Sequence, residues 1–154
     1  MPERRALGLA SRGLRLAAAM VDGVLSLFVS LPLVFYTGYL EKALAGTVDY
    51  VTGYAISLVG LAMFAAMHGY LLVKHGQTIG KRWVGTRIVN VSDGRVPTIR
   101  ALLVRYATMK LVAYIPLVGG LFALVNILFI FRRDRRCLHD LAAGTKVVIM
   151  PFSR

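Results

Sequence analysis

Two long apolar runs constrain this chain more than any other feature of its sequence. Residues 16–35 and 51–73 each have the length of a helix that crosses a bilayer, which takes about 20 residues, and the second run contains no Lys, Arg, Asp or Glu. Hydrophobic residues make up 57% of the chain and charged residues 17%, yet the formal net charge is +12. A nucleic-acid-binding domain would carry that charge on a more polar background. We therefore expect an integral membrane protein and no nucleic-acid partner.

The basic residues that flank these runs predict the orientation of the chain. Four arginines lie at or before position 15, one lysine lies in the connector 36–50, and six basic residues lie in the segment 74–100. Lys and Arg accumulate on the cytoplasmic side of membrane proteins. We therefore expect a protein of the cytoplasmic (inner) membrane, with both termini and the segments 1–14, 74–100 and 132–154 in the cytoplasm.

A third apolar stretch, residues 101–131, is interrupted by Arg105, Lys110 and Pro116. Four arginines between positions 132 and 136 follow it, so a single crossing would place this basic cluster outside, against the charge bias. Each half of the stretch is short for a span. The pattern predicts a helical hairpin broken near Pro116, which gives up to four membrane helices in a single domain of residues 1–154.

Two short segments rich in β-branched residues predict a pair of strands. Residues 85–91 and 144–150 both begin with Gly-Thr, followed by a basic residue and aliphatic residues. Pairing these segments requires both to lie on the same side of the membrane, which again favours an even number of crossings between them. The expected fold class is an all-α integral membrane protein with a small cytoplasmic β pairing.

Three motifs, taken in order, resemble the RDD family of small membrane proteins. They are RLAAAMVD from Arg15 to Asp22, GQTIGK from Gly76 to Lys81, and RCLHDLAAGT from Arg136 to Thr145. The resemblance covers about residues 10–150 and implies that Arg15, Asp22 and Asp140 are the residues for which the family is named. It also implies transport of an unidentified ligand, with sodium/proton exchange proposed for some members.

Asp22 lies about seven residues inside the first apolar run, roughly 10 Å deep. An ionised carboxylate there costs about 2.5–3.5 kcal/mol, so it must be paired, protonated or beside water. Arg15 and Ser26 lie on the same helix face as Asp22. Arg15 is two turns away, so we expect a water or a partner from another segment between Arg15 and Asp22. His68 of the second run reaches a similar depth. The four residues predict either an ion or proton site or a contact that fixes helix register.

Asp140 lies in a basic neighbourhood near the end of the chain. It could tether Arg15 or Arg105, or cap backbone amides, and both a structural and a functional role stay open. The remaining basic residues most simply mark the membrane surface, where each Lys or Arg gains near 1 kcal/mol from anionic headgroups. The candidates for headgroup contact are Lys81, Arg82, Arg132, Arg133, Arg135 and Arg136.

The sequence contains no known catalytic motif, so we expect no enzymatic activity. The three histidines lack metal-ligand spacing, so we expect no metal and no cofactor. Two functions remain. One is transport of an ion or small solute around Asp22 by a homo-oligomer, because two spans and a hairpin scarcely enclose a pathway. The other is a non-transporting membrane module, such as a lipid-binding, assembly or accessory subunit, in which the Arg/Asp cluster is structural.

Overall fold

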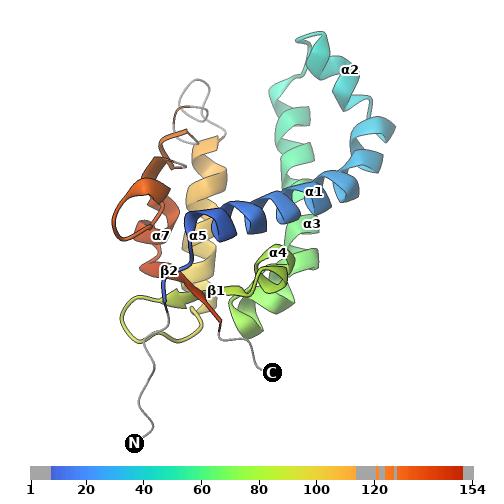
Figure 1. Ribbon diagram of the computed structural model, residues 1–154. Helices are drawn as coiled ribbons and strands as arrows, with labels where there is room; N and C mark the ends of the chain where they lie inside the picture. Colours follow the sequence, from blue (N-terminus) through green and yellow to red (C-terminus); the bar gives the residue numbers. More distant parts are fainter. Residues whose placement is uncertain (1–7, 114–120, 122–123, 127, 151–154) are drawn as a thin grey trace, which may run out of the picture.

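Two long apolar helices dominate the molecule (Figure 1). The computed structural model describes residues 8–113, 121, 124–126 and 128–150. Helix α1 spans Arg12–Tyr36 and helix α3 spans Tyr50–His75, and both are long and apolar enough to cross a membrane. Only 11% of the most apolar stretch of each is buried, so their apolar side chains mostly face outward. The two predicted runs are therefore confirmed as helices that could span a bilayer.

The long helices begin and end where the sequence supplies caps. The Ser11 hydroxyl accepts a hydrogen bond from the Leu14 amide at the start of α1, and the Asp49 carboxylate accepts one from the Thr52 amide at the start of α3. Gly76 ends α3 in the left-handed conformation that glycine adopts at low cost. The shorter elements are α2 (Tyr39–Leu44), α4 (Ile79–Trp83), α5 (Ile99–Ala113), η1 (Phe129–Phe131) and α7 (Leu138–Ala142).

The predicted hairpin of residues 101–131 is described only in part. Helix α5 covers its first arm as far as Ala113, while the expected break at Pro116 lies outside the described residues. Positions 121 and 124–126 are helical, and the turn η1 follows them. A fourth membrane helix therefore stays a prediction.

The two predicted strand segments pair in the structure. Strand β1 spans Thr86–Asn90 and strand β2 spans Thr145–Ile149, and they are antiparallel with Thr86 opposite Ile149. The N-terminal segment adds an edge to this pair: the Ala10 amide donates to the Val147 carbonyl at 3.0 Å, and the Ile149 amide donates to the Gly8 carbonyl at 2.9 Å. Segments from the beginning, middle and end of the chain thus meet at one end of the molecule. Their placement in the cytoplasm stays a prediction.

A small apolar core lies where these segments meet the helices. Its buried members are Ala10, Leu72, Ile88, Leu102 and Val147, and Phe64 and Tyr106 pack against it. The core packs the sheet against the C-terminal end of α3, through Leu72, and against the first turn of α5, through Leu102. This arrangement brings parts of α1, α3, α4, α5 and α7 close together (Figure 1).

Candidate functional site

Asp140 is fully buried and forms ion pairs with two arginines from two other helices. Arg15 on α1 donates to Oδ2, and Arg105 on α5 donates to Oδ1. The Cys137 amide also donates to Oδ2 at 3.1 Å, and the Thr145 hydroxyl donates to Oδ1 at 3.3 Å. The predicted tether to Arg15 or Arg105 is therefore present, and Asp140 holds both arginines rather than one.

The charges around Asp140 keep it ionised. Burial raises the pKa of this carboxyl, but the charges of Arg105 and Arg15 outweigh that effect and hold the pKa well below its usual range. Because a guanidinium only donates hydrogen bonds, the contact of 3.0 Å from Arg105 makes Nε2 of His139 an acceptor. Nδ1 then donates to the Asn126 side chain at 2.9 Å. Burial and the charge of Arg105 lower the pKa of His139 to about 3, against the opposing effect of Asp140, so this imidazole is neutral at pH 7.

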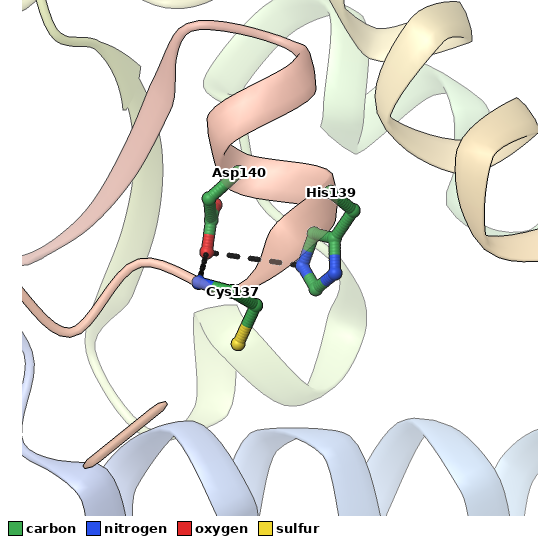
Figure 2. Close-up of side chains that lie close together, drawn as sticks. All are labelled: Cys137, His139 and Asp140. Atoms are coloured by element: carbon green, nitrogen blue, oxygen red, sulfur yellow. Dashed lines mark hydrogen bonds and ion pairs between the residues drawn. The ribbon is translucent and has the colours of Figure 1, made fainter. Parts of the chain in front are cut away.

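Cys137, His139 and Asp140 lie close together at the start of α7, with ligand-type atoms within 4.8 Å of one another (Figure 2). Their partners make this trio a poor site for a metal cation. Both carboxylate oxygens already bind guanidinium groups, and both ring nitrogens of His139 are engaged. Burial also raises the pKa of the Cys137 thiol despite the nearby charge of Arg15, so no thiolate is available. The trio therefore belongs to the ion-pair cluster of Asp140.

Asp22 is the centre of a second polar cluster, and its partners come from the segment between α3 and β1. The Thr78 hydroxyl donates to Oδ2 at 2.5 Å, and the Gly80 amide donates to Oδ1 at 2.7 Å. Thr78 also caps α4 by accepting from the Lys81 amide at 3.2 Å. Asp22 is 8% exposed, so these bonds satisfy a carboxylate that is almost completely buried.

Two further ionisable groups lie next to Asp22 without a hydrogen bond to it. The Lys81 ammonium is 3.9 Å from Oδ2, and Nε2 of His68 is 4.0 Å from Oδ1. Nδ1 of the fully buried His68 ring accepts from the Ile79 amide at 3.3 Å, so the proton of the neutral ring lies on Nε2. That nitrogen has no hydrogen-bond partner among the described residues. The expected approach of His68 to Asp22 is thus present at a distance longer than a hydrogen bond.

The lysine of this cluster is protonated at neutral pH. Burial and the charge of Arg105 lower the pKa of Lys81 to about 8, with Asp22 acting in the opposite direction and Arg15 adding to the decrease. The side chain of Lys81 is only 15% exposed. It therefore contributes a positive charge inside the molecule rather than on its surface.

Arg15 does not pair with Asp22, although both lie on the same face of α1. Its guanidinium binds Asp140 and the Arg135 carbonyl instead. Asp22 binds Thr78 and Gly80, which come from another segment. The hydrogen bonds of Arg15 go to other residues, so no bridge between Arg15 and Asp22 is seen among the described residues. The GQTIGK motif held the signal for both partners of Asp22, because a buried carboxylate requires donors and this motif offers a hydroxyl and a glycine amide.

A cavity of about 430 Å³ lies between the two polar clusters. Leu16, Ala19 and Phe64 form an apolar part of its wall. Ser26, predicted to continue the polar face of α1, also lines it. The charged and polar lining includes Arg15, Asp22, Ser26, Lys81, Arg105 and His139.

The six basic residues predicted to contact headgroups fall into two groups. Arg82, Arg132 and Arg133 are exposed. Arg135 and Arg136 are half-buried and donate to backbone carbonyls of Ala10 at 3.4 Å and Thr145 at 3.1 Å. Lys81, as described above, lies in the cavity beside Asp22. The structure therefore favours headgroup contact for the first group only.

The comparisons with known proteins agree with the motifs. The model of the RDD family matches residues 9–144. An uncharacterised protein of Haemophilus influenzae is 31% identical over 145 residues, covering 92% of this chain and 79% of its own length. The uncharacterised protein YckC of Bacillus subtilis is 43% identical over 72 residues, which are 47% of this chain and 46% of YckC. No solved structure matches. The chain belongs to the RDD family.

Proposed function

We propose that this protein moves an ion or small solute across the inner membrane through the cavity beside Asp22, without catalysing a reaction. One observation carries the proposal: a buried carboxylate lines a cavity between candidate spans, and two of its ionisable neighbours remain about 4 Å away without a hydrogen bond. Polar and ionisable groups inside a membrane bundle commonly mark the path of a transported species. Of these two neighbours, Lys81 lines the cavity and can contact a ligand there, while His68 is fully buried behind it.

Proton-coupled cation exchange is the form of transport that the family resemblance suggests. Asp22 is the one carboxylate among the described residues that line the cavity, so a transported cation would bind there. The purified protein would be reconstituted into liposomes that contain a pH-sensitive dye, and Na⁺, K⁺ or Li⁺ would be added in turn. Cation-dependent proton release should be lost in Asp22→Asn and kept in Asp134→Asn, which removes a carboxylate that is 37% exposed.

A non-transporting module is the second candidate, and the Asp140 cluster favours it. This cluster joins α1, α5 and α7 through bonds that engage both oxygens of its carboxylate, which is what a structural clamp requires. The same flux assay separates the candidates. If Asp22→Asn inserts and assembles normally but loses flux, Asp22 acts in transport. If the substitution mainly prevents folding, or if well-incorporated wild-type protein shows no flux, the module is favoured.

We also propose that both termini and the two-stranded sheet lie in the cytoplasm. The pairing of residues 8–10 with β2 supports a common side for the N-terminal segment and the sheet, and the positive-inside bias supports the cytoplasm. In spheroplasts, a membrane-impermeant maleimide should label Glu41→Cys and should label Ser92→Cys only after permeabilisation. Both positions are exposed, and the native Cys137 is buried and should react slowly. The opposite labelling pattern would show that the termini and the sheet lie outside the cytoplasm.

A further inference from the structure

The charged groups at the cavity do not balance. Three cations line it, Arg15, Lys81 and Arg105, while Asp22 lines it and Asp140 is paired to the lining arginines. Both imidazoles nearby are neutral, for the reasons given above. Among the described residues, three positive and two negative groups leave a surplus of one positive charge. Burial makes such a surplus costly unless a ligand supplies the opposite charge.

Lys81 is the cation in this group with donors to spare. The guanidinium groups of Arg15 and Arg105 are committed to Asp140, to the Arg135 carbonyl, to Thr145 and to His139. The Lys81 ammonium, in contrast, has no hydrogen-bond partner among the described residues, and its nearest carboxylate oxygen is 3.9 Å away. Asp22 itself is occupied by Thr78 and Gly80, which reduces its repulsion of an anion bound to Lys81.

The rest of the cavity is suited to an apolar body. Leu16, Ala19, Phe64 and Val147 contribute apolar side chains to its wall, and its volume of about 430 Å³ lies within the range of small-molecule sites. A ligand that joined one negative charge to an apolar body would satisfy both parts of the lining. A bound monovalent cation would raise the surplus to two positive charges, and a phosphate monoester, with about −1.5 to −2 charges at neutral pH, would exceed the single charge needed.

We propose that the cavity binds a small organic monocarboxylate, with its carboxylate held by the Lys81 ammonium and its apolar body against α1 and Phe64. This inference rests on the proposed transport function and names the class of solute for the same cavity, an organic anion in place of the cation that the family resemblance suggests. The ligand can come from water, as a short organic acid, or from the bilayer, as a fatty acid. The chemistry that recognises the headgroup is the same in both cases.

The test is equilibrium binding of radiolabelled benzoate to the purified full-length protein in nanodiscs of zwitterionic lipid. Benzylamine, benzyl alcohol and phenyl phosphate share the ring and differ in charge, so they serve as competitors. Saturable benzoate binding that phenyl phosphate displaces weakly and the other two do not displace would support the proposal. Saturable binding of benzylamine without binding of benzoate would overturn it.

Substitutions assign the binding to Lys81. Lys81→Gln should weaken benzoate binding by about 30-fold or more, because it removes one partner of a buried charge pair. Lys81→Arg should retain much of the affinity. Lys74→Gln is the matched control, because it removes an exposed lysine that donates to the Tyr70 hydroxyl. Equal loss in the Lys74 and Lys81 variants would overturn the assignment.

The experiment also separates this inference from the proposed function. A cation site predicts that Asp22→Asn abolishes ligand binding, whereas a carboxylate site predicts that Asp22→Asn binds benzoate at least as well as the wild type. Benzoate binding without flux of benzoate or cations in liposomes would support the site and refute transport. Cation flux without benzoate binding would support transport and refute the carboxylate site.

Competition with fatty acids of different length distinguishes the two sources of the ligand. If dodecanoate displaces benzoate at far lower concentration than butyrate does, the ligand comes from the bilayer. If the two displace benzoate at comparable concentrations, the ligand comes from water.

Discussion

Asp140 illustrates how one buried carboxylate can decide the stability of the molecule. Its side chain is fully buried and is paired with Arg15 and Arg105, which are 8% and 4% exposed. Removing one partner of a buried ion pair leaves the other charge without compensation, which costs far more than the loss of an exposed pair. The cluster thus concentrates much of the stability of this end of the molecule in one residue.

Asp140→Asn should lower the free energy of unfolding by about 3–5 kcal/mol, because two buried guanidinium groups lose their counter-ion. Asp134→Asn is the control: it disrupts an exposed pair with Arg132 and should cost about 0–1 kcal/mol. Both values can be measured by denaturant titration in mild detergent. Equal costs for the two substitutions would show that the Asp140 cluster is not a buried clamp.

The neutral state of His139 makes stability depend on pH. The pKa of His139 is lowered from 6.5 in the unfolded chain to about 3 in the folded protein. Between pH 6.5 and pH 3, the unfolded chain therefore binds a proton at His139 that the folded protein does not. The free energy of unfolding should therefore fall as the pH drops from 6.5 towards 3, with a further loss from Asp140 below its ordinary pKa of 3.8. Unfolding measured at steps from pH 7.5 to 4.5 should show a shallower slope in His139→Gln. Identical slopes would contradict this assignment.

Residue-level reasoning from the sequence succeeded where one chemical requirement had few solutions. Asp140 in a basic neighbourhood needed a cation, and Arg15 and Arg105 were the candidates named. The partners of Asp22 could not be named in the same way, because they depend on α4 folding back against α1. Lys81 was assigned to the membrane surface on charge alone, since sequence does not show that its side chain turns inward.

At the scale of the elements, the contact between α1 and α4 positions the Asp22 site. Gly80 permits it: a Cβ at this position would lie 2.3 Å from the Ala18 carbonyl oxygen and 2.9 Å from Oδ1 of Asp22. Both contacts are closer than real Cβ atoms show, and the first is with backbone that cannot move aside cheaply. The close approach of a five-residue helix to α1 therefore requires glycine here.

Gly80→Ala should push α4 away from α1 and cost about 1–3 kcal/mol, the usual range for overpacking. It should also lengthen the bonds to Asp22 and reduce any ligand binding in the cavity. Gly69→Ala on α3 is the control, because nothing lies within 4 Å of its Cβ position and alanine favours the helix. Thermal unfolding and benzoate binding of the two variants provide the measurement. A Gly80 variant as stable as the control would refute the packing argument.

The helices and strands were more predictable than their boundaries. The apolar runs located α1 and α3, and each helix begins before its run because a polar cap, Ser11 or Asp49, sets its first residue. The β-branched segments located β1 and β2. The additional edge formed by residues 8–10 was not predicted, because nothing in that short segment alternates as a strand does.

For the whole molecule, the outstanding feature is the amount of apolar surface on the two long helices. Only about a tenth of the most apolar stretch of each helix is buried. Large apolar side chains such as Phe28 and Leu58 are 68% and 67% exposed. Lipid or a second copy of the chain must cover this surface. Two such helices scarcely enclose a pathway by themselves, which is why the transport proposal requires an oligomer.

The protein should therefore form an oligomer of two or more copies of the chain in a lipid environment. Native mass spectrometry of nanodiscs, loaded at several protein-to-lipid ratios, should give a fixed stoichiometry above one. Dilution into excess lipid tests whether the assembly is specific or results from crowding. A monomer at every ratio would weigh against transport and favour the structural module.

The bonds between distant parts of the chain also impose an order on biosynthesis. The partners of Asp22 lie 56 and 58 positions later in the chain, and the carboxylate that binds Arg15 lies 125 positions after it. Since synthesis proceeds from the N-terminus, α1 is made before the partners of Asp22 and Arg15 exist. Asp22 acquires its partners once α4 has emerged, and Arg15 only when α7 is complete. Until then neither side chain has the partner that it holds in the folded protein, so the two polar clusters can form only in this order.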